Sequence, residues 1–352
     1  MSKSLQLILK SHKSGFLLLV FFSLFACVDI EEYPNNPRGN FEALWTIMDE
    51  HYCFFEYKKE WIDWNKIHSE YKEKVKNDMD DEALFALLNE MLQELKDGHV
   101  NLYTPFDVGR YWKWFEDYES NFDESLINKY LDSTYAIAGS IRYQILEDNI
   151  GYLYYGNFSS VIGETNLDYI IHGMSDCRGL IIDVRNNGGG LLSNVNKIAS
   201  RFVTEKTLVG YMQHKTGKAH DAFSEPVARY IEPSARLHYQ KPVVVLTNRS
   251  CFSATNDFVN AMRYCPKVTI LGDRTGGGSG LPFSSELPNG WSVRFSVCPM
   301  LDADKNHLEL GIEPCIRKDL LPSDVEKGKD TLIEAAKQEI KNWSSSCSDR
   351  FN

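Results

Sequence analysis

The pattern of apolar positions changes once along the chain, from a helical period to short continuous runs. Between Phe41 and about Leu102, apolar residues recur every three or four positions, as on one face of a helix. Asp80 or Asp81 can cap a second helix, and Gly98 stands where a helix would stop. The apolar stripes comprise Phe41, Leu44, Trp45 and Met48, then Leu84, Leu87, Leu88, Met91, Leu92 and Leu95. We therefore predict a small N-terminal helical domain over residues 41–102.

After Asn149, apolar runs alternate with helical stretches. Continuous Val, Ile and Leu runs are typical of strands that are buried on both faces. The predicted strands are Ile150–Tyr155, Gly179–Val184, Pro242–Thr247 and Val268–Leu271, and the helices between them cover about Leu192–Phe202 and Ala254–Arg263. A hairpin over 284–297 and a last helix over 331–343 follow. This alternation predicts an α/β domain over residues 149–345, joined to the helical domain by a connecting region at 103–148.

The first residues form a processing segment. Three lysines precede an apolar run at 16–22 that is too short to span a membrane. The sequence Leu24-Phe-Ala-Cys27 resembles a bacterial lipobox, in which the cysteine is lipidated. We therefore expect a lipoprotein signal peptide at 1–26, a lipid on Cys27 and an acidic tether at 27–40. The alternative is an ordinary cleaved signal with a chance cysteine.

Charge and cysteine spacing exclude several classes of function. The net charge is −11, and loss of the three lysines of residues 1–26 makes it −14. Such a charge argues against a nucleic-acid partner. The eight cysteines contain no CxxC pair and no histidine spacing suited to zinc, so we expect no metal and no cofactor. Disulfide pairing and oligomeric state stay open.

Two segments of the α/β domain have features of an acyl-transfer site. Ser253 lies at a predicted strand-to-helix junction, where free N–H groups and the helix dipole favour an anion. On this segment alone an ordinary N-cap is favoured, because capping is the commonest reason for a serine at a helix start. The run Gly188–Gly190 follows a buried strand and can point backbone N–H groups into a site, or can form a plain turn. His99 and Glu309 are weak candidates by themselves.

Three motifs together resemble the tail-specific (carboxy-terminal-processing) serine proteases. They are Asp183-Val-Arg-Asn-Asn-Gly-Gly-Gly190, Ser253-Ala-Thr-Asn-Asp-Phe258 and Gly272-Asp-Arg-Thr-Gly-Gly277, in the order of the family. The resemblance implies an α/β fold with the spiral core of Clp protease and crotonase. It also places the nucleophile at Ser253 and not at Ser250. Many relatives carry a PDZ insert, but residues 103–145 are too few for one, so we predict that it is absent.

The two branches of this family differ in their base. In the Ser–Lys branch the base falls at about Gly278 here, where no lysine is present. The branch that resembles the tricorn protease core uses a histidine and a downstream glutamate. The resemblance therefore assigns His99 as the base and Glu309 as the residue that orients it, with Glu313 as the alternative. The implied oxyanion hole comprises the backbone N–H groups of Ala254 and of Gly189 or Gly190.

We therefore expect a Ser-His-Glu endopeptidase that cleaves peptides or unfolded protein. It would be lipid-anchored at the bacterial cell envelope, on the periplasmic side or on the outer surface. The main alternative is a catalytically inactive binding lipoprotein on the same fold. Acyl-CoA chemistry of the crotonase type is disfavoured by export, because the cofactor is absent outside the cytoplasm.

Overall fold

The computed structural model describes residues 33–343. This part of the chain begins with a group of helices. They are α2 (Pro37–His51), α3 (Phe55–Lys58), α4 (Trp64–Lys74) and α5 (Asp81–Gln93). Asp80 caps α5 by accepting a 2.9 Å hydrogen bond from the Ala83 N–H. Helix α2 begins at Pro37, and Gly39 and Asn40 are buried in it. The helical domain therefore takes up residues 37–40, which we had predicted to be the end of the tether.

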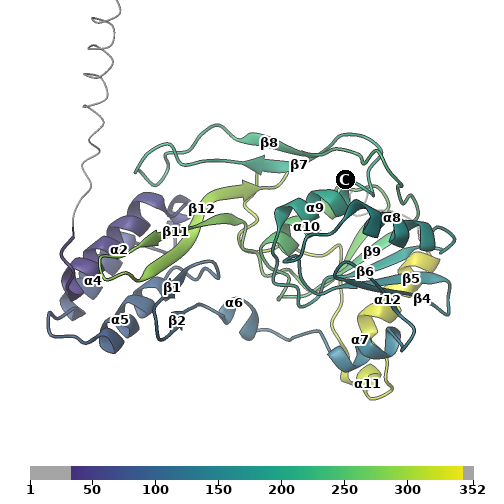
Figure 1. Ribbon diagram of the computed structural model, residues 1–352, viewed down its shortest axis with the longest axis horizontal. Coiled ribbons are helices and arrows are strands. Elements are labelled where there is room, and N and C mark those ends of the chain that lie inside the picture. Colours follow the sequence, from purple (N-terminus) through teal and green to yellow (C-terminus); the bar gives the residue numbers. More distant parts are fainter. Residues whose placement is uncertain (1–32, 344–352) are drawn as a thin grey trace, which may run out of the picture.

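An antiparallel sheet adjoins these helices, and its strands β1 and β12 pack on them. The strand order is β2-β1-β12-β7-β8, with β11 also paired to β12. The bounds are β1 (Asn101–Tyr103), β2 (Val108–Gly109), β7 (Thr207–Met212), β8 (Val227–Ile231), β11 (Gly280–Glu286) and β12 (Ser292–Leu301). The predicted hairpin is thus present, but Leu287, Trp291 and Val293 from it pack in the helical core. The predicted domain boundary at residue 149 therefore does not separate the two bodies, because segments that follow it in the sequence pack in the first body (Figure 1).

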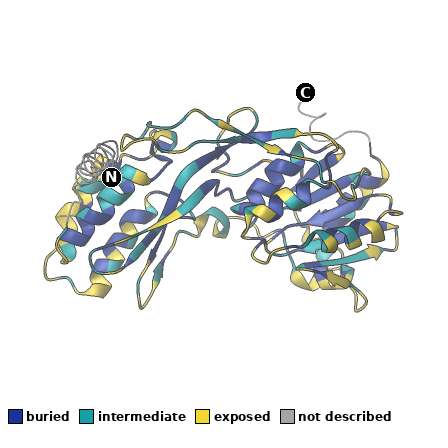
Figure 2. Ribbon diagram, turned by 45° about the horizontal axis from the view of Figure 1, so that its top comes forward, coloured by how far each residue is buried: buried dark blue, intermediate teal, exposed yellow. Residues whose placement is uncertain are grey.

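The second body is a sheet with helices on both faces (Figure 2). The strand order is β13-β10-β9-β6-β5-β4-β3, and β5, β6, β9, β10 and β13 run parallel. The strands are β3 (Ala136–Ala138), β4 (Ile141–Leu146), β5 (Ile150–Tyr155), β6 (Leu180–Asp183), β9 (Val243–Thr247), β10 (Val268–Gly272) and β13 (Ile316–Arg317). Because β3 and β4 belong to it, this sheet begins before the predicted residue 149. The predicted α/β class is confirmed.

Different helices supply the cores on the two faces of this sheet. Apolar residues of α8 (Glu164–Gly173), α9 (Leu192–Ala199) and α10 (Ala254–Arg263) pack on one face. Residues of α7 (Glu124–Tyr130) and α12 (Thr331–Lys341) pack on the other. Two further short helices, α6 (Lys113–Glu116) and α11 (Pro322–Val325), lie outside these layers. The connecting region 103–148 thus contributes short elements to both bodies.

The carboxyl ends of β6 and β9 lie side by side, since Asp183 pairs with Leu246 in parallel register. Strand β6 leads into Gly188–Gly190, and β9 leads into the turn before Ser253. The turn after β6 is anchored by Arg185, which is fully buried between Asp183 and Asp330 at 2.6 and 2.9 Å. The topology therefore brings both candidate segments to one edge of the sheet, where open α/β sheets bind their ligands.

Within residues 33–343, no helix is both long enough and apolar enough to cross a membrane. The predicted signal peptide and Cys27 lie outside the described residues.

Candidate active site

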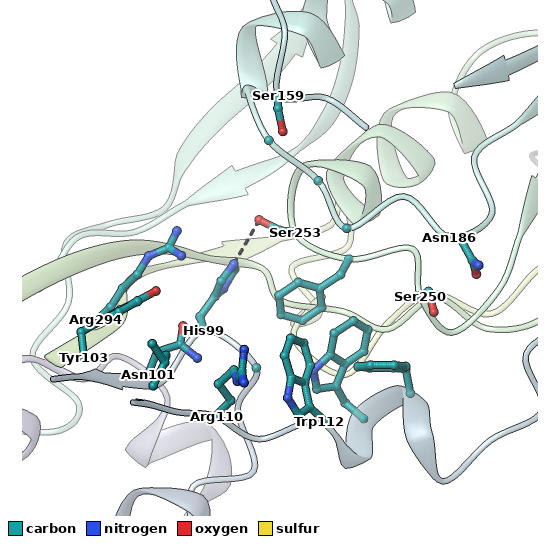
Figure 3. Close-up of a pocket in the computed structure, with 18 residues that line it drawn as sticks. His99, Asn101, Tyr103, Arg110, Trp112, Ser159, Asn186, Ser250, Ser253 and Arg294 are labelled. Carbon is teal, nitrogen blue, oxygen red and sulfur yellow. Dashed lines mark hydrogen bonds between the residues drawn. The ribbon is translucent and has the colours of Figure 1, made fainter. Parts of the chain in front are cut away.

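Ser253 occupies the N-cap position of α10, yet its side chain does not cap the helix. The Ser253 hydroxyl instead lies 3.0 Å from His99 Nε2 (Figure 3). The backbone at Ser253 has φ 58° and ψ −121°, a conformation that costs energy for a residue with a Cβ. It is held there by a 2.8 Å hydrogen bond from the Ser253 N–H to the Gly277 carbonyl. The local structure thus turns the hydroxyl away from capping and toward a histidine.

His99 comes from the first body, in the loop between α5 and β1. Its side chain is buried, and its backbone N–H donates to Asp97 Oδ1 at 2.7 Å. The ring packs on Phe252, which in turn stacks on Trp114. Burial lowers the pKa of His99 to about 4; the Asp97 charge opposes this shift and the Arg294 charge adds to it. His99 is therefore neutral at physiological pH, which is the form that accepts a proton.

The glycine run packs directly against the backbone of the serine. A Cβ on Gly189 would lie 2.9 Å from both the Ala254 nitrogen and Ser253 Cβ, and φ at Gly189 is +100°. The Gly189 N–H already donates to Asn187 Oδ1 at 3.0 Å. Within the described residues, the N–H groups of Gly190 and Ala254 have no acceptor, which for Ala254 follows from its place at the start of α10. Of the three predicted oxyanion donors, Gly190 and Ala254 are thus the two that are free.

The two candidate glutamates lie in very different surroundings. Glu309 is buried, accepts a 3.0 Å hydrogen bond from the Ser279 N–H and lies 3.6 Å from Lys58 Nζ. Burial and the charge of Asp97 raise the pKa of Glu309, while Lys58 opposes that rise. Glu313 has a 65% exposed side chain and pairs with Arg274.

The expected contact between Glu309 and the far nitrogen of His99 is not formed in this structure. His99 Nδ1 is buried and has no hydrogen-bond partner among the described residues. The carboxylate of Glu309 is held instead by the Ser279 N–H and by Lys58. The structure therefore brings Ser253 and His99 together, but Glu309 is not hydrogen-bonded to either ring nitrogen of His99.

A buried polar cluster behind the histidine includes residues that sequence reasoning missed. Lys58 Nζ donates to Tyr52 Oη at 2.8 Å, and Tyr52 Oη donates to Asp97 Oδ2 at 2.9 Å. Lys58 also donates to the Leu95 carbonyl at 3.0 Å and is 2% exposed. Asp97 stands two residues before His99 in the sequence, but no spacing links Tyr52 or Lys58 to His99. This cluster connects the first body to Glu309 of the second.

The structure also explains why no lysine base fits near position 278. Gly278 has φ +75°, and a Cβ there would lie 2.3 Å from the Phe252 ring. The carbonyl of Glu309 accepts a hydrogen bond from the Gly278 N–H, which closes the loop further. A side chain at this position would displace the ring on which His99 packs.

The serine and histidine open into a cavity of about 690 Å³. Ser250 also lines this cavity, but Figure 3 shows it on the far side of the aromatic side chains from His99. A second cavity, of about 240 Å³, also borders Ser253, and Leu191, Leu281 and Met300 are among the residues that line it. The Ser253 side chain thus borders two cavities.

The chain is similar to proteins of known family and to solved structures. The sequence profile of peptidase family S41 matches residues 149–317, and that of the tricorn protease C1 domain matches residues 33–93. The crystal structure of a protein assigned as a peptidase from Parabacteroides merdae superposes with a TM-score of 0.84 and 53% identity, covering 87% of this chain and 97% of that chain. Mature CPAF superposes with a TM-score of 0.68 over 88% of this chain and 98% of its own, but at 13% identity this shows the fold alone.

The chain belongs to peptidase family S41, the tail-specific serine proteases. The predicted family is thus confirmed. Among curated relatives, the carboxy-terminal processing protease CtpA of Bacillus subtilis is 24% identical over 179 residues, which is 50% of this chain and 36% of that protein. The match to each of the first curated relatives thus spans about a third of that relative's length.

The contact between Gly189 and the serine backbone generates a testable prediction. Gly189→Ala should slow the reaction of Ser253 with a fluorophosphonate probe by at least about tenfold, because the added methyl group pushes on Ser253 and on a strained backbone. Gly188→Ala is the matched control, since a Cβ at Gly188 meets nothing within 4 Å. Equal labelling rates for the two variants would contradict this account of the loop.

Proposed function

We propose that this protein is a serine endopeptidase that cleaves peptides or unfolded protein through an acyl-enzyme. The observation that carries the proposal is the 3.0 Å contact between Ser253 Oγ and a buried, neutral His99. His99 takes the Ser253 proton as Oγ attacks the scissile carbonyl carbon. The oxyanion that forms is stabilised by the N–H groups of Gly190 and Ala254. When the C–N bond breaks, His99 gives its proton to the leaving amine. A water molecule then attacks the acyl-enzyme carbonyl carbon while His99 takes its proton. When the ester bond breaks, His99 returns a proton to Ser253 Oγ and the carboxylic acid product is released.

Glu309 is the proposed third member of the site. An imidazolium forms on His99 in the transition state, and a carboxylate nearby offsets its charge. In the resting structure Glu309 and Asp97 lie in one buried cluster with a single lysine, Lys58. We propose that this cluster offsets the positive charge of the His99 imidazolium, and that Glu309 contacts His99 Nδ1 when substrate is bound. Glu313 is too exposed for this role.

The first test concerns the nucleophile. Ser253→Ala should reduce hydrolysis of denatured casein by at least about 10⁴-fold, because no other group can form the acyl-enzyme. Ser250→Ala should keep most of the activity, although Ser250 lines the same cavity. Wild-type activity in Ser253→Ala would refute the mechanism. Failure of the wild type to react with a fluorophosphonate would instead favour an inactive binding protein.

The second test concerns the two glutamates. Glu309→Gln should lower kcat by roughly 10²–10⁴-fold, since the imidazolium loses its balancing charge. Glu313→Gln should be close to wild type. Thermal unfolding of both variants controls for stability, and the pH at which activity is lost should change only in Glu309→Gln. An equal loss in both variants would contradict the assignment.

The third test uses the pKa of His99. General-base catalysis needs the neutral ring, so activity is lost as pH falls through the pKa of the folded enzyme. Because burial lowers this pKa from 6.5 to about 4, activity should persist at about pH 5 and decline below it. The measurement is kcat/KM against pH, with circular dichroism to exclude unfolding. Half-maximal activity near pH 6.5 would show that His99 is not desolvated in the working enzyme.

We further propose that the protein is held at the cell envelope by a lipid on Cys27. The lipobox-like sequence Leu24-Phe-Ala-Cys27 supports this, and the periplasmic and outer faces stay open. Cys27→Ser should move the protein from the membrane fraction to the soluble exported fraction, with loss of incorporated radiolabelled fatty acid. Unchanged partition and labelling would contradict a lipid anchor.

A further inference from the structure

Lys58, the last residue of α3, is a buried lysine that takes no direct part in the proposed proton transfers. Its side chain is 2% exposed. Its ammonium group donates hydrogen bonds to Tyr52 Oη at 2.8 Å and to the Leu95 carbonyl at 3.0 Å, and it lies 3.6 Å from Glu309 Oε1. Lysine is almost never fully buried unless it is paired, because a charge that leaves water loses its hydration. The free-energy cost of burying this ammonium must therefore be offset by its partners.

Lys58 is not placed to act as the base itself. A general base must come within hydrogen-bond reach of the hydroxyl that it deprotonates, and the ring of His99 holds that place at 3.0 Å from Ser253 Oγ. Neither cavity beside the serine includes Lys58 among the described residues that line it. An ammonium has three N–H groups, and the three contacts given above can take one each. Any effect of Lys58 on the reaction must therefore pass through these neighbours.

Glu309 is the neighbour of Lys58 that bears on the chemistry. Burial and the charge of Asp97 raise the pKa of Glu309, while Lys58 and the hydrogen bond from the Ser279 N–H lower it. Without the lysine, this carboxyl group would therefore keep its proton to a higher pH. A protonated Glu309 carries no negative charge and cannot offset an imidazolium.

Within the described residues, Lys58 is the cation that pairs with Glu309. Other charged side chains line a cavity of about 290 Å³ that Glu309 borders, and they are Lys96, Lys113, Asp117, Arg249 and Arg274. The remaining titratable neighbours are neutral at pH 7, because burial shifts their pKa values against the charged form. They are Tyr52, Cys53, Tyr57 and His307. The charge state of Glu309 thus depends chiefly on two opposing neighbours, Lys58 and Asp97.

The charges of this buried cluster match the imidazolium state of the site. With His99 neutral and both carboxyl groups ionised, the cluster holds one positive charge, on Lys58, and two negative charges, on Asp97 and Glu309. When His99 takes the serine proton, two positive and two negative charges lie inside the protein. Buried charges are tolerated when they are paired. The lysine therefore lets both carboxylates stay ionised and leaves one negative charge to balance the imidazolium.

We propose that Lys58 is a positioning residue of the site, which keeps Glu309 ionised and in place so that the His99 imidazolium forms with a balancing charge. This inference rests on the proposed function, since it assigns a role in that reaction. A lysine with a merely structural role would affect activity by the same factor at every pH. A lysine that sets the charge of Glu309 changes the shape of the pH profile instead.

The test is the dependence of kcat on pH in Lys58→Met. Because loss of the cation raises the pKa of Glu309, the pH at which activity is lost on acidification should move upward by about one to three pH units. On the acid side, kcat should thus be at least about tenfold below that of the wild type, and it should approach the wild-type value as pH rises. Lys59→Met is the matched control, because Lys59 is adjacent, 60% exposed and paired with Glu56, and it should keep the wild-type profile. Profiles of Lys58→Met and wild type that differ only by a constant factor would overturn the inference.

Further variants show whether the lysine acts through Glu309. In the Glu309→Gln background the carboxylate is already gone, so adding Lys58→Met should change kcat by less than about threefold. Tyr52→Phe removes the hydrogen bonds through which Lys58 reaches Asp97 and leaves the contact with Glu309, so it should keep the wild-type pH profile. Additive losses in the double variant would overturn the role assigned to Glu309. So would a shift in Tyr52→Phe as large as that in Lys58→Met.

Asp97→Asn keeps the inference testable if thermal unfolding shows that Lys58→Met does not fold. Loss of the Asp97 charge lowers the pKa of Glu309 and also that of His99. The pH at which activity is lost should therefore move downward, and an unchanged or higher value would overturn the inference. Absence of hydrolysis and of fluorophosphonate labelling in the wild type would overturn the proposed function itself. An active wild type with any of the contrary pH profiles would overturn only the role of Lys58.

Discussion

The hydroxyl of Ser253 can react only if two separately packed bodies keep their relative position, because the base comes from one and the nucleophile from the other. His99 belongs to the helical body, and Ser253 starts a helix on the parallel sheet. The long hairpin of β11 and β12 and the pair β7–β8 tie the two together (Figure 1). The buried contact from Lys58 to Glu309 does the same behind the histidine. The geometry of the Ser253–His99 contact therefore depends on how the two bodies pack against each other.

The second constraint is the backbone of Ser253, whose positive φ stores strain that the surroundings must hold. Glycine at 189 allows its loop to reach the serine more closely than any side chain permits. Glycine at 277, where a Cβ would clash with the Glu309 carbonyl, allows a second loop to place its own carbonyl on the Ser253 N–H. The Phe252 ring fills the remaining space and is shared with His99. The same packing that aims the hydroxyl also excludes a lysine at 278, so the strain and the choice of base have a common origin.

Local patterns predicted much of this arrangement. Strand β5 and helix α10 have the predicted bounds, because continuous apolar runs and a strong helical period leave little choice of structure. The predicted domain boundary does not separate the two bodies, since β12, with its partner β11, returns to the first body through contacts distant in sequence. Lys58 and Arg294 could not be foreseen as parts of the site, because only the fold brings them near His99. The contact between Glu309 and His99 was expected from the family and is not formed here.

The most direct test of the central claim is the rate and position of phosphonylation by a fluorophosphonate, read by peptide mass mapping. The account predicts a single adduct on Ser253, formed at least about 10²-fold more slowly in His99→Ala than in the wild type. His172→Ala, which changes an exposed histidine on α8, should react at the wild-type rate. An adduct on another serine, or an unchanged rate in His99→Ala, would contradict a site shared between the two bodies.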